Sequence, residues 1–115
     1  MSIGYPASHY TLTAGSGGVT INRFALANGT LAGVGSHPVG IAAATAASGA
    51  TFTLAALGCA LMEAGGAIAV GGAIEVDASG RGIAPAGNST NPVVARALTA
   101  ATNQGDLILV NLIPN

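Results

Sequence analysis

Short runs of alternating or continuous apolar residues, separated by glycine-rich turns, recur along this 115-residue chain. Residues 19–26 (VTINRFAL) alternate between apolar and polar positions, and residues 39–42 (VGIA) form a short apolar run after a loop at 33–38. Alternation with a period of two is typical of a strand with one buried face, and a short apolar run is typical of a buried strand. We therefore predict a strand in each segment.

The alternation in residues 51–63 is only partial, because three leucines would equally line one face of a helix: Leu54, Leu57 and Leu61. Gly58 divides this region, and a glycine weakens a strand interior and often marks a bend or an end. We therefore favour strands over a helix and predict two that pair with each other, at 51–57 and 59–63.

The clearest turn chemistry lies between residues 73 and 84. A short strand pattern at 73–76 is followed by DASG at 77–80, and residues 81–84 form the returning strand before Pro85 ends the pairing. The Asp77 side chain can accept hydrogen bonds from the backbone two residues on, and Gly80 can adopt a left-handed conformation. The sequence therefore predicts a β-hairpin over 73–84.

The C-terminal region contains two further strand patterns, 92–98 (PVVARAL) and 107–113 (LILVNLI), joined by a turn at 102–106. The second is almost continuously apolar, so we expect it to be buried on both faces. Regularly spaced short strands with glycine-rich turns are typical of a small barrel or sandwich. We predict an all-β fold of about seven or eight strands, with residues 19–115 as a single domain.

Residues 1–18 contain both tyrosines and one of the two histidines but few aliphatic side chains, and they end in a Gly/Ser run. We predict an extended N-terminal arm, since residues 1–14 could span about 46 Å and touch a neighbouring subunit. A disordered terminus is the alternative. Aromatic and imidazole rings favour a binding arm, and its candidate interface residues are Tyr5, Pro6, His9 and Tyr10.

Charged residues make up only 6% of the chain, the formal net charge is −1, and there is no lysine, whereas ordinary soluble domains have about 25% charged residues. We expect partners to cover so uncharged a surface. A membrane is not the predicted partner, because the uncharged stretch 41–62 is rich in Ala, Gly, Ser and Thr rather than Leu, Ile and Phe. We also predict no signal peptide, since the first ten residues lack a basic start and an apolar core.

Nucleic acid is not a predicted partner either, because the only basic side chains besides histidine are three arginines. Two of them, Arg23 and Arg81, are counted among the candidate interface residues. The third is Arg96.

Catalysis would require acids, bases or nucleophiles that converge on one place. His9 and His37 each follow a serine, but side chains of adjacent residues in an extended chain point apart. Cys59 is the only cysteine, so it can form no intrachain disulfide, and its apolar neighbours predict that it packs as a small hydrophobic group. These residues also lack metal-ligand spacing. We predict that the protein is not an enzyme and holds no metal or cofactor.

Two blocks of the sequence are the most specific parts of a resemblance that covers nearly the whole chain. They are AGGAI-x-x-GG-x-I-x-x-D-x-x-GR at 64–81 and ARAL-x-x-A-x-x-x-GDL-x-x-V at 95–110. The chain resembles the capsid cement, or decoration, proteins of tailed bacteriophages. It departs from their pattern in having fewer charges and a longer aromatic N-terminal segment.

The resemblance implies a small β-barrel-like or β-tulip domain that is part of the virion. It implies binding to the outer surface of the expanded capsid, commonly as a homotrimer, where the domain would hold neighbouring major capsid protein subunits together. Assembly would take place in the host cytoplasm. Two other classes stay open: a different virion module, such as a tail or fibre component, and a small-ligand-binding barrel, which would need a roomy cavity.

Overall fold

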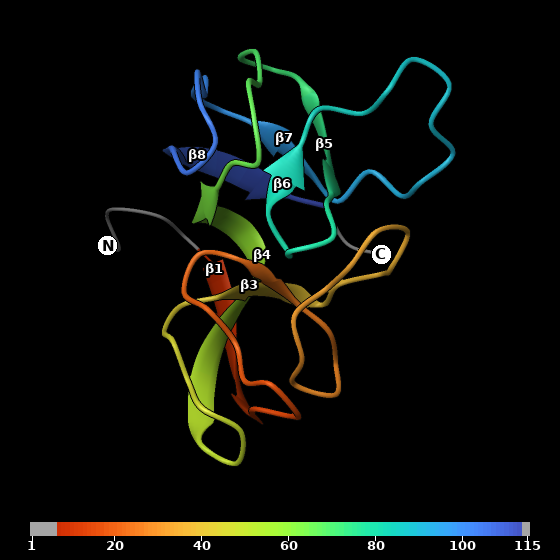
Figure 1. Ribbon diagram of the computed structural model, residues 1–115. Helices are drawn as coiled ribbons and strands as arrows, with labels where there is room; N and C mark the ends of the chain where they lie inside the picture. Colours follow the sequence, from red (N-terminus) through yellow and green to blue (C-terminus); the bar gives the residue numbers. More distant parts are fainter. Residues whose placement is uncertain (1–6, 114–115) are drawn as a thin grey trace, which may run out of the picture.

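The computed structural model describes residues 7–113, and these residues are built from strands and loops (Figure 1). All described strands belong to one antiparallel sheet with the order β2-β3-β4-β8-β7-β5-β6, and β1 is added to β4. The predicted all-β fold with short strands is therefore confirmed, although strand pairing leaves the described sheet open. The strands are β1 (Ala7–Thr13), β2 (Phe24–Ala25), β3 (Gly40–Ala42), β4 (Thr51–Glu63), β5 (Ala73–Val76), β6 (Gly82–Ile83), β7 (Ala95–Ala97) and β8 (Leu107–Leu112).

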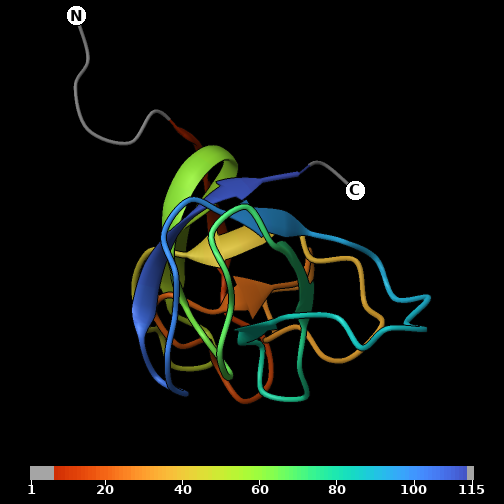
Figure 2. The same ribbon diagram turned by 90° about the horizontal axis from the view of Figure 1, so that it is seen from above.

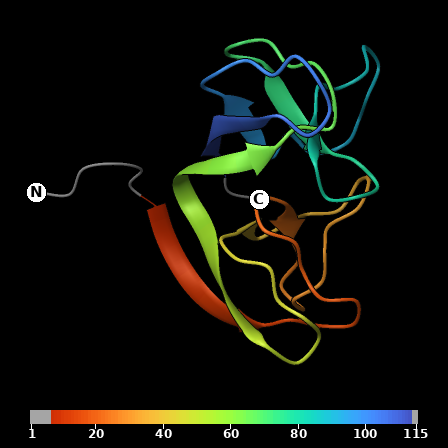
Figure 3. The ribbon, with the colours of Figure 1, turned by 60° about the vertical axis from the view of Figure 1, so that its left-hand side comes forward.

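The long strand β4 connects the two halves of the molecule. Residues 51–58 pair with β1, residues 54–55 also pair with β3 on the opposite edge, and residues 58–63 pair with β8. Gly58 has a φ of 90°, which glycine adopts at little steric cost, and β4 bends sharply near its middle (Figure 3). The prediction of two paired strands in this region is wrong, because Gly58 bends one continuous strand instead of ending it.

Buried side chains form two cores. The larger core packs mainly β4, β5, β7 and β8 together, and its fully buried large side chains include Met62, Ile74, Ile108 and Val110. The smaller core lies under β1, β3 and the first half of β4, and four of its seven buried members are alanines. Its two large members from β4 are Phe52 and Leu54. The β1 half of the molecule therefore buries less apolar side-chain area per strand than the β8 half.

The β5–β6 hairpin forms as predicted, with Glu75 opposite Ile83. Asp77 Oδ1 accepts hydrogen bonds from the backbone N–H groups of Ser79 at 2.8 Å and Arg81 at 2.9 Å. Gly80 has a φ of 81°, the left-handed conformation expected from the sequence. The loop from 84 to 94 that follows this hairpin extends away from the rest of the domain (Figure 2).

Two strand predictions need correction. Only Phe24 and Ala25 of the predicted strand 19–26 form β2, because Asn22 has a left-handed φ of 67° that interrupts the extended chain. The second correction concerns β8, which was predicted to be buried on both faces. Its residues alternate between the core and the surface, so it buries one face only.

Residues 7–13 of the predicted arm form β1, which lies along β4 of the same domain (Figure 3). Ala14, which follows β1, is buried in the smaller core. Residues 1–6 lie outside the described part of the chain. Within residues 7–113, no helix has the length and apolar character needed to cross a bilayer.

Candidate functional site

One edge of β1 is unpaired within the described chain. β4 is its pairing partner, and no other described strand runs along its outer side (Figure 3). Beyond the end of β1, the Ala14 N–H donates to Ala50 and the Ala14 carbonyl accepts from Gly49, both at 2.8 Å. Ala14 therefore turns both backbone groups toward the β4 side.

The orientation of Ala14 also determines which backbone groups of β1 point away from β4, because alternate residues of an antiparallel strand bond to the same neighbour. Leu12 and Tyr10 share the orientation of Ala14, while Thr11 and Thr13 point their N–H and carbonyl groups away from β4. The opposite strand agrees, since the carbonyl of Thr53, which opposes Thr11, accepts from Ala43 on the other edge of β4 at 2.8 Å. The Thr13 carbonyl lies against Gly29, so the edge that another strand could pair with consists of the N–H and carbonyl of Thr11 and the N–H of Thr13.

This edge also lacks charge. The first charged side chain of the sequence is Arg23, and the next is Glu63 at the end of β4. Proteins commonly protect exposed edge strands with lysine, other charges or proline, because an unprotected edge pairs with foreign strands. β1 (ASHYTLT) has none of these protecting residues.

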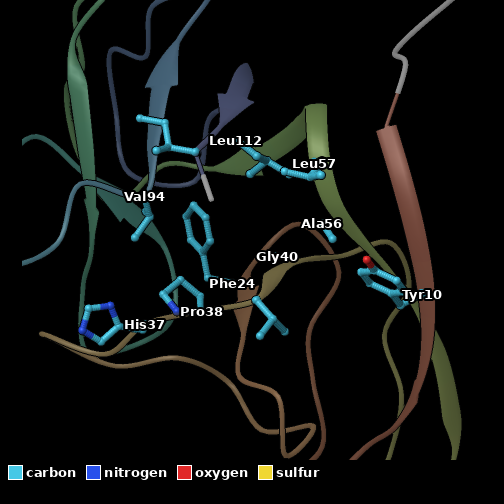
Figure 4. Close-up of a pocket in the computed structure, with 11 residues that line it drawn as sticks. Tyr10, Phe24, His37, Pro38, Gly40, Ala56, Leu57, Val94 and Leu112 are labelled. Carbon is cyan, nitrogen blue, oxygen red and sulfur yellow. The ribbon is translucent and has the colours of Figure 1, made fainter. Parts of the chain in front are cut away.

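An apolar hollow lies on one side of the β1–β4 ribbon, and Tyr10 extends from β1 toward it (Figure 4). Its volume is about 260 Å³. Tyr10 is 58% exposed and Leu57 is 42% exposed, so large apolar groups here face solvent. We call this hollow the tyrosine hollow, and the residues that define it are Tyr10, Phe24, Val39, Leu57, Val94 and Leu112.

A second apolar hollow of about 320 Å³ shares no lining residue with the first. Because His9 and Tyr10 are adjacent in a strand, their side chains leave opposite faces of the ribbon. Cys59, a free and half-buried thiol, lies in this second hollow, as do the exposed side chains of Ile21 and Leu61. We call it the histidine hollow, and it is defined by His9, Ile21, Ala43, Ala55, Cys59 and Leu61.

The two predicted interface arginines contact the same carboxylate. Arg23 Nε lies 3.1 Å from Glu63 Oε1, and Arg81 Nε lies 2.5 Å from Glu63 Oε2. All three side chains are largely buried, with 17–20% of each exposed. Hydrogen bonding from Arg23 is the largest influence on the pKa of Glu63, and with Arg81 it lowers that pKa although burial opposes the change. The cluster joins β4 to the segment before β2 and to the hairpin.

The structure therefore separates the six predicted interface residues. His9 and Tyr10 line the two hollows beside the free edge. Arg23 and Arg81 have an intramolecular partner. Tyr5 and Pro6 lie outside the described residues, so their predicted role stays a prediction.

Other chemically versatile side chains are dispersed or used structurally. Ser36 donates its hydroxyl to the Gly33 carbonyl at 2.6 Å and so closes a turn. Buried Glu75 accepts a hydrogen bond from the Ser89 hydroxyl at 2.6 Å, which anchors the 84–94 loop. Among residues 7–113, no three His, Cys, Asp or Glu side chains gather in a way that could hold a metal ion.

These features define a small, open-sheet β domain whose most accessible site is a backbone edge between apolar hollows. The family model for phage cement proteins matches residues 6–112, and the chain belongs to that family. The protein is accordingly a structural component of the phage virion at the capsid surface.

The fold is also similar to a crystal structure of the head fiber gp8.5 N base of bacteriophage phi29. The two share 20% sequence identity with a TM-score of 0.73, and the match covers 94% of this chain and 95% of that one. At this level of identity the similarity establishes a common fold. A comparison with curated protein sequences finds no match.

Proposed function

We propose that the protein is a capsid decoration protein that binds the outer surface of the expanded head and stabilises contacts between neighbouring major capsid protein subunits. Membership of the phage cement family supports this function. The structural observation that supports it most directly is the uncharged, unpaired edge of β1 beside exposed apolar side chains. The proposed role is structural and needs no catalytic step.

A homotrimer is part of the proposal, on the strength of the resemblance seen in the sequence. A head-to-tail contact that closes after three subunits would form a ring around a local threefold axis of the shell. Each subunit would then contact both its neighbours and the capsid. This arrangement accounts for a surface on which so few side chains are charged.

Decoration would stabilise the shell by mass action. A protein that binds only the expanded lattice stabilises it by about 4 kcal/mol per site when its free concentration is about a thousand times Kd. Because a shell has many equivalent sites, a modest contact at each one is sufficient.

The proposal is tested by mixing purified protein with expanded and unexpanded shells and imaging both by electron microscopy. We expect added density on the outside of the expanded shells only. Equal binding to both kinds of shell would contradict a role in the mature head. Absence of binding to either would contradict decoration altogether.

The N-terminal segment is proposed to contribute to attachment. Deletion of residues 1–14 would strip β1 from β4, so loss of binding by that variant could follow from a damaged fold. Deletion of residues 1–6 leaves β1 in place. We expect this shorter deletion to weaken shell binding without changing the thermal midpoint, and unchanged binding would remove residues 1–6 from the interface.

A fibre base on the head is a second candidate, favoured by the fold similarity to the phi29 head fiber N base. The same images distinguish the two, because a fibre base supports an elongated projection and a decoration protein forms compact knobs. A small-ligand barrel is not favoured, since the described sheet is open and encloses no barrel interior.

A further inference from the structure

We propose that the free edge of β1 accepts an extended, uncharged strand of a capsid protein, so that the sheet of this domain continues into its partner. The inference rests on the proposed decoration function and assigns the surface through which it acts. Strand addition to an exposed sheet edge is a common mode of protein recognition, in which backbone hydrogen bonds provide affinity and flanking side chains provide selectivity.

The backbone of β1 is suited to this pairing. On the outer side, Thr11 presents both its N–H and its carbonyl, and Thr13 presents its N–H, as the bonding of Ala14 establishes, while the Thr13 carbonyl lies against Gly29. Thr11 is exposed, as are the residues beside it from Ser8 to Tyr10. An incoming strand of about five residues would span both threonines and use their free backbone groups.

The side chains next to this edge indicate what the incoming strand should contain. Its alternate side chains would project to opposite faces, one set beside Tyr10 and the other beside His9. These residues form the rims of the tyrosine and histidine hollows. Both rims expose large apolar groups, including Leu57 on one face and Ile21 on the other. The geometry therefore favours a segment with apolar residues on both faces and no charge.

A second copy of this chain fits the edge less well. The strands at the two ends of the main pairing order, β2 and β6, contain only two residues each. The N–H of Phe24 in β2 is already bonded to the Gly80 carbonyl. Among the strands of residues 7–113, self-pairing would therefore have to join β1 to β1, which creates a twofold dimer and not the proposed threefold ring. A capsid strand satisfies the edge without this conflict.

The decisive variant is Thr11→Pro, which removes an outward N–H while the residues bonded to β4 keep theirs. Proline is tolerated at such edge positions because its missing donor faces away from the sheet. Thr11→Ala is the matched control, since it shortens the same side chain but keeps the N–H. We expect Thr11→Pro to reduce affinity for expanded shells about tenfold or more, as measured by co-sedimentation. Thr11→Ala should bind like the unmodified protein.

A second variant guards against misfolding of the proline variant. Thr13→Lys places a protecting charge on the same edge without changing the backbone, and we expect a similar loss of affinity. The thermal midpoint of each variant shows whether the domain is still folded. Binding of Thr13→Lys at full strength would overturn the inference even if Thr11→Pro did not fold.

The outcomes separate this inference from the proposed function. If the unmodified protein does not bind expanded shells, both are wrong. If it binds and the folded edge variants bind equally well, decoration stands and the edge is not its contact surface. Sedimentation velocity without shells tests the other occupant: a dimer that Thr11→Pro converts to a monomer would identify a second copy as the partner of β1 and overturn the capsid strand.

Discussion

β1 and β8 are both antiparallel partners of β4, and neither contains a charged residue. They differ in what surrounds them. β8 buries Ile108, Val110 and Leu112 in the larger core, and its second edge is paired with β7. β1 exposes residues 8–11, and its second edge is unpaired within the described chain.

This difference suits β8 to stabilising the fold and β1 to binding a partner. Burial of apolar side chains holds β8 in place, whereas β1 depends chiefly on backbone bonds to β4 and on the partly buried side chain of its own Leu12. Segments with few buried contacts open at low free-energy cost, and binding sites are often drawn from them. β1 can therefore adjust to a partner while the β8 half keeps the domain folded.

Native-state hydrogen exchange should show the largest contrast. The amide of Leu12 points toward β4 and therefore reports the opening of β1, while the amide of the fully buried Val110 reports the larger core. We expect exchange at Leu12 to be faster than at Val110 by on the order of a hundredfold or more. Equal protection of the two amides in NMR measurements would show that β1 and β8 belong to one cooperative unit.

Ile108→Ala directly tests how much the larger core around β8 contributes to stability. The side chain is 2% exposed in the larger core, so its truncation leaves a cavity and should cost about 2–5 kcal/mol in the free energy of unfolding. Tyr10→Ala on β1 is the matched comparison, and it should cost about 0.5 kcal/mol or less because the ring is exposed. Urea denaturation of both variants measures the difference. A Tyr10 effect as large as that of Ile108 would mean that the tyrosine hollow is part of the core.

The sequence predicts those parts of the fold that depend on local chemistry. The turn at 77–80 could be predicted because Asp77 supplies its own hydrogen-bond acceptor and Gly80 its own left-handed conformation. Gly58 could not be interpreted the same way, since the same positive φ is compatible with ending a strand or with bending one. Asn22 carried only a weak local signal, because asparagine adopts the left-handed conformation more readily than other non-glycine residues but the alternation around it favoured a strand.

The candidate site was predictable only in part, because it combines local features with side chains from segments that are distant in the sequence. The rings of His9 and Tyr10 indicated a contact surface, and both line hollows. The rest of the tyrosine hollow comes from distant segments, including Phe24, Leu57 and Val94, and no local pattern brings these together. The free edge had one sequence signal, which is the absence of charge before Arg23.

Glu63→Gln tests whether the ion pairs of Glu63 with Arg23 and Arg81 stabilise the fold and do not take part in binding. Glu63 lies opposite Leu107 of β8 and accepts hydrogen bonds from both Arg23 and Arg81. Loss of its charge should cost about 1–3 kcal/mol, because the carboxylate is largely buried and accepts charge-assisted hydrogen bonds from two arginines, and shell binding should be unchanged. Arg23→Gln is the companion variant. Loss of shell binding by a folded Arg23→Gln protein would instead support the predicted interface role of this arginine.

The pH dependence of stability should be the smallest effect and should come from the same cluster. The pKa of Glu63 in the folded protein lies below its usual value of 4.5, chiefly because Arg23 donates hydrogen bonds to the carboxylate. A depressed folded pKa stabilises the folded state above the unfolded value, and this stabilisation is lost as the pH falls through the folded value. The free energy of unfolding should therefore be level above about pH 5 and decline at lower pH. Asp106 should add to the decline, because the backbone N–H groups of Asn103 and Thr102 lower its pKa as well. In Glu63→Gln the decline should be shallower, and an identical slope in the variant would remove Glu63 as its source.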